Sequence, residues 1–273
     1  MGKTTELPIP THESGKFCGW YLDTEYTQPI TEISKTMTGE VVVYAKWTTI
    51  FLEEDYSDGK PAVNVSEANY NDGKINYCGN GKAGASFTVK QKSDGVSYLE
   101  WTKGESDSFI NATSNVQNYS HLTGDAIVSM TFDLELIDGK PFICADAKIL
   151  ASSAQGGGED CIFQIKQNGD VCLNNRADHV IGNISTDKRV VVRVAVDFKH
   201  ETYTAYDGSG NVITSCAMVL PTKAKNQGFT TFDEWRTNRL NIYLLYMQAR
   251  VSADGAALGI NSILIEEGNA FTK

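Results

Sequence analysis

The chain has 273 residues, with 34 acidic and 24 basic side chains and a formal net charge of −10. This charge excludes nucleic acid and an anionic membrane surface as partners, because both are bound through a basic face. Hydrophobic residues make up 41% of the chain, and no apolar run reaches the ~20 residues of a membrane-spanning helix, so a folded chain without membrane insertion is expected. The 24 glycines and the many aromatic residues favour an all-β fold.

Residues 1–48 differ from the rest of the chain, and two short aromatic strands are predicted there, at residues 16–22 and 40–47. The stretch resembles the internalin-type B-repeat, a small β-grasp-like module of bacterial surface proteins. The resemblance rests on the motifs FCGWY at residues 17–21 and GEVVVYAKW at residues 39–47. The opening strand of that family is missing, so we expect the chain to begin inside a repeat. Four aromatic residues are expected to form a small core rather than a ligand platform: Trp20, Tyr21, Tyr44 and Trp47.

From residue 49 onward the chain is a succession of predicted strands. In residues 125–137 every second residue is apolar, as a strand with one buried face requires, and residues 188–198 repeat this pattern. Asn168-Gly169 predicts a tight, two-residue hairpin turn. A short helix is expected at residues 230–235, capped by Thr231 toward Glu234. Further strands are predicted at residues 142–150, 161–167, 170–174, 202–206, 211–216, 240–248 and 257–266.

Ten or more strands with hairpin spacing predict a two-sheet antiparallel β-sandwich of jelly-roll type over residues 49–273, after the β-grasp-like repeat at residues 1–48. The second domain resembles the concanavalin A-like lectin/glucanase superfamily, which includes carbohydrate-binding modules. Four landmarks carry this resemblance in the order in which they follow along the chain: LEEDYSDG at residues 52–59, SYLEW at 97–101, the paired strands of 190–208, and ALGINSILIE at 257–266.

The sequence does not supply a complete catalytic motif. Glucanases of this fold carry E-x-D-x-x-E on one strand, so that two carboxylates flank the glycosidic bond. The nearest approach is Asp133-Leu134-Glu135, which has Thr131 where the first Glu would stand and no second Glu after it. A polysaccharide lyase would need a His and a Tyr base, and His121 and His179 stay open for that role. A protein without enzymatic activity is therefore expected.

Sugars are held by aromatic rings that stack on their C–H faces and by polar side chains that bond their hydroxyls, on a sheet face or in edge loops. Arg193 either contacts the ligand or forms a structural ion pair with a carboxylate such as Asp133 or Asp146. Trp235 is either an exposed loop platform or a lid over the core. The candidates for the carbohydrate site are Asp133, Gln164, Arg193, Asn241 and Tyr243 on strands, and Tyr119 and Trp235 in loops.

The superfamily resemblance also implies a structural Ca²⁺ between the acidic opening of the domain and its last strand. Oxygen ligands would come from Glu53, Asp55 and backbone carbonyls. Asn261 stands where the family often has Asp, which removes one negative ligand, and the alternative is a solvated turn. The six cysteines contain no CxxC pair, so a zinc site is not expected, and most are predicted to be buried free thiols.

Taken together, the sequence favours a non-catalytic carbohydrate-binding module of a secreted or cell-wall-attached multidomain bacterial protein. Its partners would be a polysaccharide or glycan and the other modules of the parent chain. The first alternative is an adhesin or stalk module that binds a host protein or glycan. The second is a glycoside hydrolase or polysaccharide lyase of the same fold.

Overall fold

The computed structural model of the chain describes residues 3–12, 15–59, 62–64, 70–71, 74–79, 85–102, 108–112, 126–137, 146–152, 158–237, 241–243, 246–249 and 256–271. The chain divides into two compact units, Met1–Phe51 and Leu52–Lys273, and each is described by itself. The division falls inside strand β5 (Tyr44–Glu54), slightly after the boundary expected at residue 48.

The first unit is a small arrangement of short strands. Strand β2 (Gly15–Tyr21) pairs with β3 (Pro29–Ile30) and with β5, and β1 (Thr5–Glu6) pairs with β4 (Glu32–Ile33). The rings of Trp20 and Trp47 each meet Phe17 edge to face, with centroids 5.5 Å apart. These three rings are in contact but all partly exposed, Tyr21 is partly exposed and meets Tyr26 instead, and Tyr44 is 37% exposed. The four predicted residues therefore do not form one buried core.

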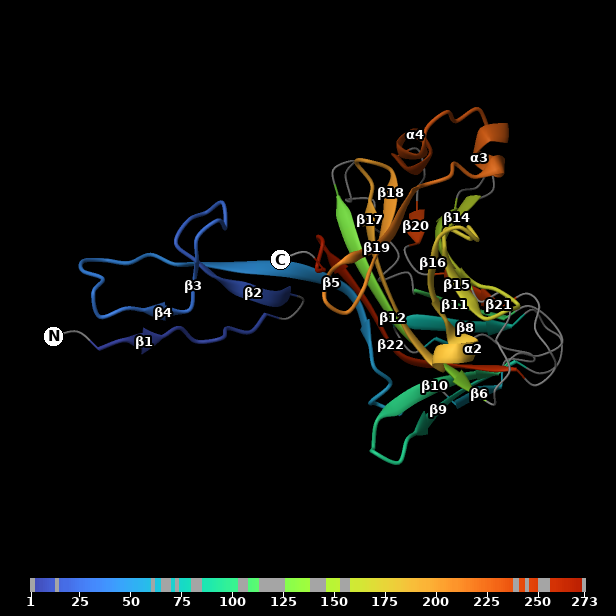
Figure 1. The fold of residues 1–273 in the computed structure, drawn as a ribbon, viewed down its shortest axis with the longest axis horizontal. Helices are drawn as coiled ribbons and strands as arrows, with labels where there is room; N and C mark the ends of the chain where they lie inside the picture. Colours follow the sequence, from blue (N-terminus) through green and yellow to red (C-terminus); the bar gives the residue numbers. More distant parts are fainter. Residues whose placement is uncertain are drawn as a thin grey trace. The chain divides into compact units, whose positions relative to one another are not determined.

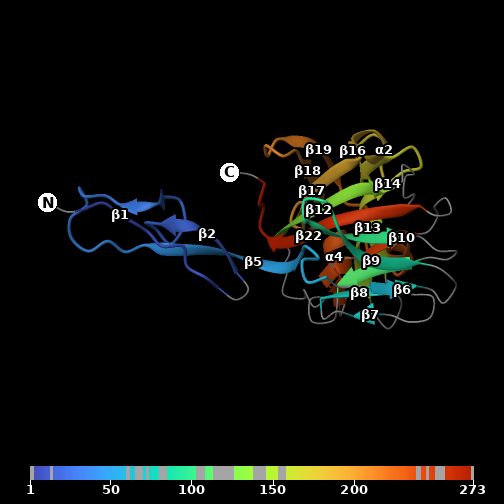
Figure 2. The ribbon, with the colours of Figure 1, turned by 90° about the horizontal axis from the view of Figure 1, so that it is seen from below.

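The second unit contains two antiparallel sheets, shown as facing layers in Figures 1 and 2. We call the first the β12 sheet. Its last strand in the sequence, β22, lies in the middle of the sheet between β12 and β10. The strands of the β12 sheet follow in the order β19 (Val212–Ala217), β18 (Thr202–Tyr206), β17 (Arg189–Asp197), β12 (Ile127–Ile137), β22 (Ala257–Glu267), β10 (Ser97–Thr102), β9 (Ser86–Gln91) and β6 (Ala62–Asn64).

The second layer of this unit is the β14 sheet, in which β20 (Asn241–Tyr243) adds to β13. Its strands follow in the order β16 (Val180–Asn183), β15 (Asp170–Leu173), β14 (Gly158–Ile165), β13 (Asp146–Ser152), β21 (Tyr246–Ala249), β11 (Ser108–Ala112), β8 (Ile75–Gly79) and β7 (Tyr70–Asn71). The prediction of an all-β, two-sheet antiparallel sandwich is confirmed.

The core lies between the two sheets and follows the predicted alternation. In β12, Val128, Met130 and Phe132 are fully buried, and the residues between them face the other side of the sheet. The ring of Phe132 meets that of Phe163 from β14 edge to face, with centroids 5.1 Å apart, which ties the two sheets together. Each such buried side chain contributes about 1.5–3 kcal/mol through removal of apolar surface from water. The opposite, outer face of the β12 sheet is left for polar side chains.

In its described part, the second unit also has three short helices: α2 (Ile184–Asp187), α3 (Thr222–Asn226) and α4 (Phe232–Thr237). The expected cap of α4 is present, because Thr231 Oγ1 accepts a hydrogen bond from the Glu234 amide at 3.1 Å. Glu234 in turn accepts one from the Thr230 amide at 3.0 Å. Among the described residues, no helix has the length and apolar character needed to cross a membrane.

Four cysteines in the described part of the chain are not joined in disulfide bonds. Cys172 and Cys216 are buried, as expected, whereas Cys161 is partly exposed and Cys18 is exposed. The side chains of the remaining two, Cys78 and Cys144, lie outside the described residues.

The hairpin between β14 and β15 differs from the tight turn that was expected at Asn168-Gly169. The Lys166 amide donates to the Asp170 carbonyl at 2.7 Å, and the Gly169 amide donates to the Lys166 carbonyl at 2.9 Å, so the loop is longer than two residues. Gly169 adopts a φ of 88°, and its carbonyl oxygen accepts a hydrogen bond from the Ile184 amide at 2.8 Å. The loop is thereby fastened to the beginning of α2.

Replacing Gly169 by Ala is expected to destabilise the second unit by about 2–4 kcal/mol, because a left-handed φ and a steric clash add together. A Cβ at this position would lie 2.6 Å from Ser185 Cβ and 2.8 Å from Asn183 Oδ1. Gly228→Ala is the matched control, since Gly228 also has a positive φ of 90° but has open space around it. Urea unfolding followed by circular dichroism measures both, and equal losses would show that Gly169 is not sterically constrained.

Candidate functional site

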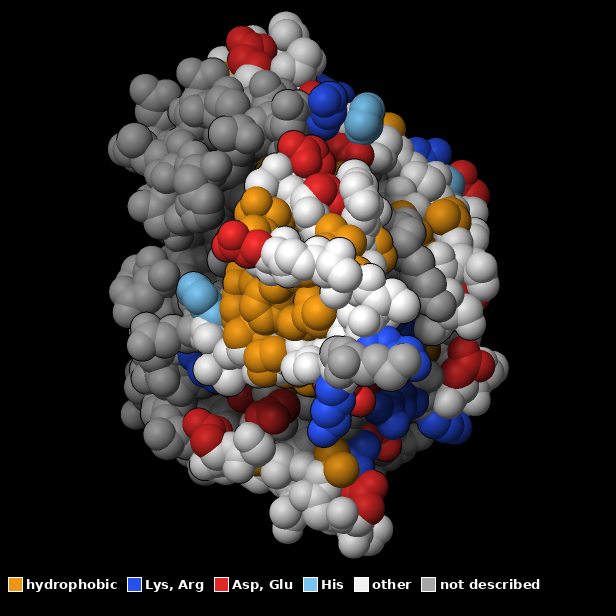
Figure 3. All heavy atoms as spheres, turned by 90° about the vertical axis from the view of Figure 1, so that its left-hand side faces the viewer, with side chains coloured by type: hydrophobic (Ala, Val, Ile, Leu, Met, Phe, Trp, Pro, Cys, Tyr) orange, Lys and Arg blue, Asp and Glu red, His pale blue; other side chains and the backbone are white. Residues whose placement is uncertain are grey.

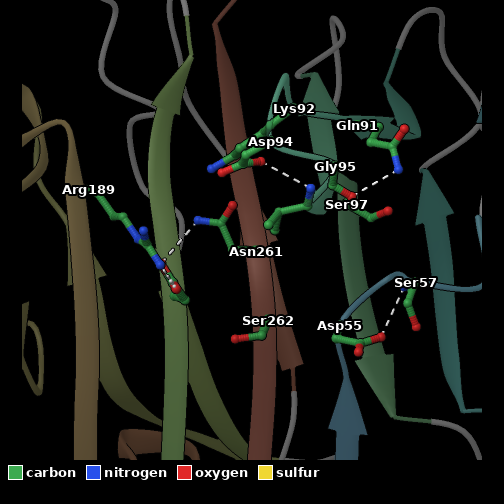
Figure 4. A pocket seen from close by; sticks show the side chains of 12 residues that line it. Asp55, Ser57, Gln91, Lys92, Asp94, Gly95, Ser97, Arg189, Asn261 and Ser262 are labelled. Carbon is green, nitrogen blue, oxygen red and sulfur yellow. Dashed lines mark hydrogen bonds and ion pairs between the residues drawn. The ribbon is translucent and has the colours of Figure 1, made fainter.

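A hollow of about 500 Å³ opens on the outer face of the β12 sheet. We call it the Asp133 pocket. The central strands supply Asp133 from β12, Arg189 from β17 and Asn261 from β22, and the hairpin between β9 and β10 forms a wall that includes Lys92 (Figure 4). Asp55, just after β5, lines the opposite side. Most of the lining side chains are polar or charged.

Asp133 is the centre of a hydrogen-bonded network. Arg189 binds its carboxylate with two donors, Nε to Oδ1 at 2.8 Å and Nη2 to Oδ2 at 2.5 Å. Asn261 donates from Nδ2 to Asp133 Oδ1 at 3.1 Å (Figure 4). Asp133 is 9% exposed and Asn261 is 7% exposed, so both groups are fixed at the floor of the pocket. A two-pronged guanidinium–carboxylate pair also fixes the orientation of the carboxylate.

The network keeps the Asp133 carboxylate ionised. Burial of this group would by itself raise its pKa, but the hydrogen bonds from Arg189 and Asn261 and the positive charges of Arg189 and Lys92 outweigh burial. The pKa of Asp133 therefore lies below its usual value. The same pair raises the pKa of Arg189, mainly through its hydrogen bond with Asp133. The pocket thus presents a permanent negative acceptor at neutral pH.

The network leaves hydrogen-bonding capacity unused. A carboxylate offers about four acceptor sites, and Arg189 and Asn261 occupy three of those of Asp133. Asn261 Oδ1 is buried and accepts no hydrogen bond from any described residue. A buried acceptor without a donor costs about 1–3 kcal/mol. The floor of the pocket is therefore prepared to receive donor groups from a ligand.

The hairpin wall is held in place by its own hydrogen bonds. The Lys92 amide donates to the Val96 carbonyl at 2.9 Å, and Gly95 completes the turn with a φ of 88°. The Lys92 ammonium pairs with Glu135 on β12 and lies 5.5 Å from the ring centroid of Tyr98. The wall is thus fixed to the sheet by a charge pair and a cation–π contact.

The structure changes the expected role of Arg193. In the register of β12 with β17, Val191 lies opposite Asp133, so Arg189 and Arg193 are its two diagonal neighbours. Sheet twist brings one diagonal closer than the other, and it is Arg189 that pairs with Asp133. The alternative of an Arg193–Asp133 ion pair is therefore wrong, whereas the side chain of Asp146, the other carboxylate considered, lies outside the described residues. Arg193 lines a separate hollow.

The other sequence candidates do not join Asp133. Trp235 is 1% exposed and packs against Phe232, with ring centroids 5.1 Å apart, so the interpretation as an exposed platform is wrong. Gln164 lies in the β14 sheet and accepts a hydrogen bond from Lys166 Nζ at 2.8 Å. Three candidates stay predictions. The backbone of Asn241 and Tyr243 forms part of strand β20, but their side chains are not described. Tyr119 lies outside the described residues.

The expected calcium ligands are not assembled as a set. Glu53 is exposed, and its carbonyl accepts a hydrogen bond at 3.0 Å from Lys74 Nζ, which also lies 3.7 Å from Glu54 Oε2. Asp55 and Asn261 line one pocket, but Asn261 turns its nitrogen toward the neighbouring carboxylate. Over the described ranges, no group of three His, Cys, Asp or Glu residues is placed to hold a metal ion. These residues fit calcium poorly, because Lys74 already supplies the positive charge.

Sequence reasoning missed Arg189 and Lys92. Arg189 is the second residue of the predicted strand at residues 188–198 and lies four residues before Arg193, hence on the same face. This four-residue spacing indicates that either arginine could face Asp133. Deciding which of the two pairs with Asp133 requires the strand register. Lys92 lies in a hairpin whose approach to β12 no local pattern reveals.

Two smaller hollows lie elsewhere among the described residues. One of about 270 Å³ is lined by Arg193, the hairpin at residues 207–210, and Phe271. Another, of about 350 Å³, lies in the first unit among Pro8, Ile9 and Trp20, together with Phe17 and Ile30. Ile9 is 82% exposed. In the view of Figure 3, hydrophobic side chains gather into a patch on the face toward the viewer. Within the described residues, neither hollow contains a buried ion-paired network like that of Asp133.

The second unit is a two-sheet antiparallel β-sandwich with a polar pocket on one outer face. No family model matches the chain, and no curated protein matches it. Among solved structures it is similar to a carbohydrate esterase of the Shiga toxin-encoding bacteriophage phi24B (13% identity, 80% of this chain and 98% of the other, TM-score 0.48). It is also similar to arcelin-5, a lectin-like defence protein of Phaseolus vulgaris (11%, 77% and 98%, 0.42), and to peanut lectin (14%, 76% and 97%, 0.39). At TM-scores below 0.5, nothing about function follows from these similarities.

Proposed function

We propose that the second unit binds carbohydrate in the Asp133 pocket without catalysing a reaction. The observation that carries this proposal is the buried, ionised carboxylate of Asp133, held by Arg189 beside the unfilled acceptor Asn261 Oδ1. Sugar hydroxyls are donors and acceptors at fixed spacing, and such a rigid set of polar groups matches them without reorganisation. Among the described residues that line the pocket none is aromatic, so hydrogen bonding rather than ring stacking supplies the affinity.

The state of the carboxylates supports a binding role over glycoside hydrolysis. A general acid in a glycosidase needs a raised pKa, whereas the pKa of Asp133 is lowered. Glu135, two residues along the same strand, is paired with Lys92. Of the histidines considered for a lyase, His179 bonds to Thr214 Oγ1 at 2.6 Å and does not line the pocket. His121 lies outside the described residues.

The wider setting of the protein forms part of the same proposal. The prediction that the parent protein is extracellular, attached to the cell wall and built of further modules depends on the B-repeat resemblance of residues 1–48, and it stays a prediction. The proposed role is to hold that parent near a glycan.

The test is a glycan array probed with the whole labelled chain, followed by affinity electrophoresis in gels that contain the polysaccharides of the positive spots. The proposal expects retardation by at least one polysaccharide, with no release of reducing sugar or unsaturated product. No retention across plant, microbial and animal glycans would exclude carbohydrate binding. Product release would instead identify an enzyme.

A further inference from the structure

Arg193 carries a positive charge that no described residue pairs with. Its side chain is partly buried on the outer face of β17, and within the described part of the chain it forms no ion pair or hydrogen bond. It lines the hollow of about 270 Å³ beside the hairpin that joins β18 to β19. We call this the Arg193 hollow. Gly208 forms part of its rim, and a Cβ added there would lie 4.0 Å from Arg193 Nη1, so the glycine leaves the guanidinium uncovered.

The acidic side chain of the hairpin, Asp207, already accepts hydrogen bonds from the hairpin itself. Asp207 Oδ1 accepts hydrogen bonds from the amides of Ser209 at 2.8 Å and Asn211 at 2.9 Å, and Oδ2 accepts one from the Asn211 side chain at 2.9 Å. These bonds hold the pKa of Asp207 below its usual value. Asp207 therefore shapes the turn and does not pair with Arg193.

The remaining residues that line the hollow are Ala270 and Phe271. Phe271 is partly exposed, and its ring packs against that of Tyr206 with centroids 5.3 Å apart. The backbone of the hairpin is pressed against the same residue, since a Cβ added at Gly210 would lie 2.5 Å from the Phe271 carbonyl oxygen. A guanidinium beside a fixed aromatic ring can bind a ring-shaped ligand that carries an anionic group.

The Arg193 hollow and the Asp133 pocket lie on the same face of the β12 sheet. Arg189 and Arg193 are four residues apart on β17, which corresponds to about 13 Å along a strand. Between them the face carries partly exposed, uncharged side chains, of which Thr131 lies opposite both Arg193 and Leu264 in the strand register. One oligosaccharide can therefore reach both hollows across this strip.

We propose that the Arg193 hollow is a second subsite that binds the carboxylate of an acidic sugar, in a glycan whose uncharged part occupies the Asp133 pocket. This inference rests on the proposed function and names its ligand class. The chain carries a net charge of −10, which disfavours a polyanion, so the ligand has an isolated carboxylate rather than one on every unit.

The experiment compares matched pairs of ligands by isothermal titration calorimetry. Tetrasaccharides of neutral hexose backbones, each with one glucuronic acid at one or the other end, are titrated into the whole chain. The same compounds are titrated after reduction of the carboxyl group, which leaves glucose. At least one acidic form should bind about ten-fold more tightly than its reduced form, as expected for one charge-assisted, two-pronged contact.

Variants assign the preference to the guanidinium. Arg193→Gln should bind both forms with the affinity of the reduced form for the unmodified protein, and Arg193→Lys should keep part of the preference. Arg176→Gln is the matched control, because Arg176 is an exposed arginine of the loop between β15 and β16, outside both hollows. Equal binding of both forms, or a preference that survives Arg193→Gln, would overturn the second subsite while leaving carbohydrate binding intact. Failure of every form to bind would overturn the proposed function as well.

Discussion

Asp133→Asn should weaken glycan binding by about 10- to 100-fold while the protein stays folded, since charge-assisted hydrogen bonds are worth about 1.5–3 kcal/mol. The change keeps the size of the side chain but removes the negative acceptor. It also brings a second amide toward Asn261 Nδ2 and leaves Arg189 without its anchor. Arg189 has a 57% exposed side chain and can be solvated, so the fold should tolerate its release.

The matched control for this change is Asp178→Asn. Asp178 is 67% exposed, lies 3.5 Å from Arg176, and is outside the Asp133 pocket. Affinity electrophoresis and calorimetry measure binding, and circular dichroism shows that each variant is folded. Unchanged affinity of Asp133→Asn together with a native spectrum would remove Asp133 from the binding site.

The pH dependence of the free energy of unfolding tests independently whether Asp133 is held ionised by Arg189 and Asn261. Because the pKa of Asp133 is lowered in the folded protein, its stabilising contribution is complete above the unfolded value of about 3.9 and is lost as the pH falls through the folded value. Urea unfolding of the unmodified protein and of Asp133→Asn should therefore differ by a constant amount between pH 5 and 8, and the difference should shrink below about pH 4. A difference that changes between pH 5 and 8 would mean that another group dominates.

Trp235→Ala should lower the stability of the second unit by about 3–5 kcal/mol, the range for removing a large buried aromatic side chain. Trp235 is 1% exposed and meets Phe232 edge to face, and Phe232 lies against Phe198, the residue directly after β17, with ring centroids 6.4 Å apart. The six-residue helix α4 is thereby fixed to the β12 sheet. Loss of the indole leaves a cavity that this short helix cannot close.

Trp235→Phe separates the loss of volume from the loss of the indole N–H. Trp235 Nε1 is buried and donates to no acceptor in the described part of the chain, so its removal sacrifices no hydrogen bond, and the cost should be well below that of Ala. Chemical denaturation followed by circular dichroism measures both variants. At a temperature at which Trp235→Ala is folded, its glycan affinity should equal that of the unmodified protein. Native stability with lost binding would restore Trp235 as a ligand platform.

The strands are predictable from the sequence where one face is buried, and the site is predictable only in part. The alternation of apolar residues in 125–137 is sufficient to define β12 and its core face. Asp133 and Asn261 are also found from the sequence, but they are assigned there to different sites, one for sugar and one for calcium. Their side chains are bonded across a separation of 128 residues, and no local pattern shows that β12 and β22 are neighbours.

Trp235 illustrates the opposite difficulty. The capping pattern at Thr231 and Glu234 correctly predicts a short helix, yet a helix of this length has no second turn from which its buried face can be inferred. Burial of the tryptophan is decided by Phe198 and Phe232 together, and Phe198 is distant in the sequence. Exposure of single aromatic residues in loops is therefore a property of the tertiary structure.

The position of β22 has a consequence for how the protein is made. This strand is the last described strand of the second unit, yet it lies between β12 and β10 and supplies Asn261 to the pocket. During synthesis, β12 and β10 cannot be joined in one sheet until β22 has left the ribosome, and such long-range pairing is slow. A chain that stops before Asn261 has neither a continuous sheet nor a complete pocket. Ligand retention would therefore report completion of the whole domain, and a nascent or truncated chain would expose the unpaired edges of strands such as β12 and β10 to its neighbours.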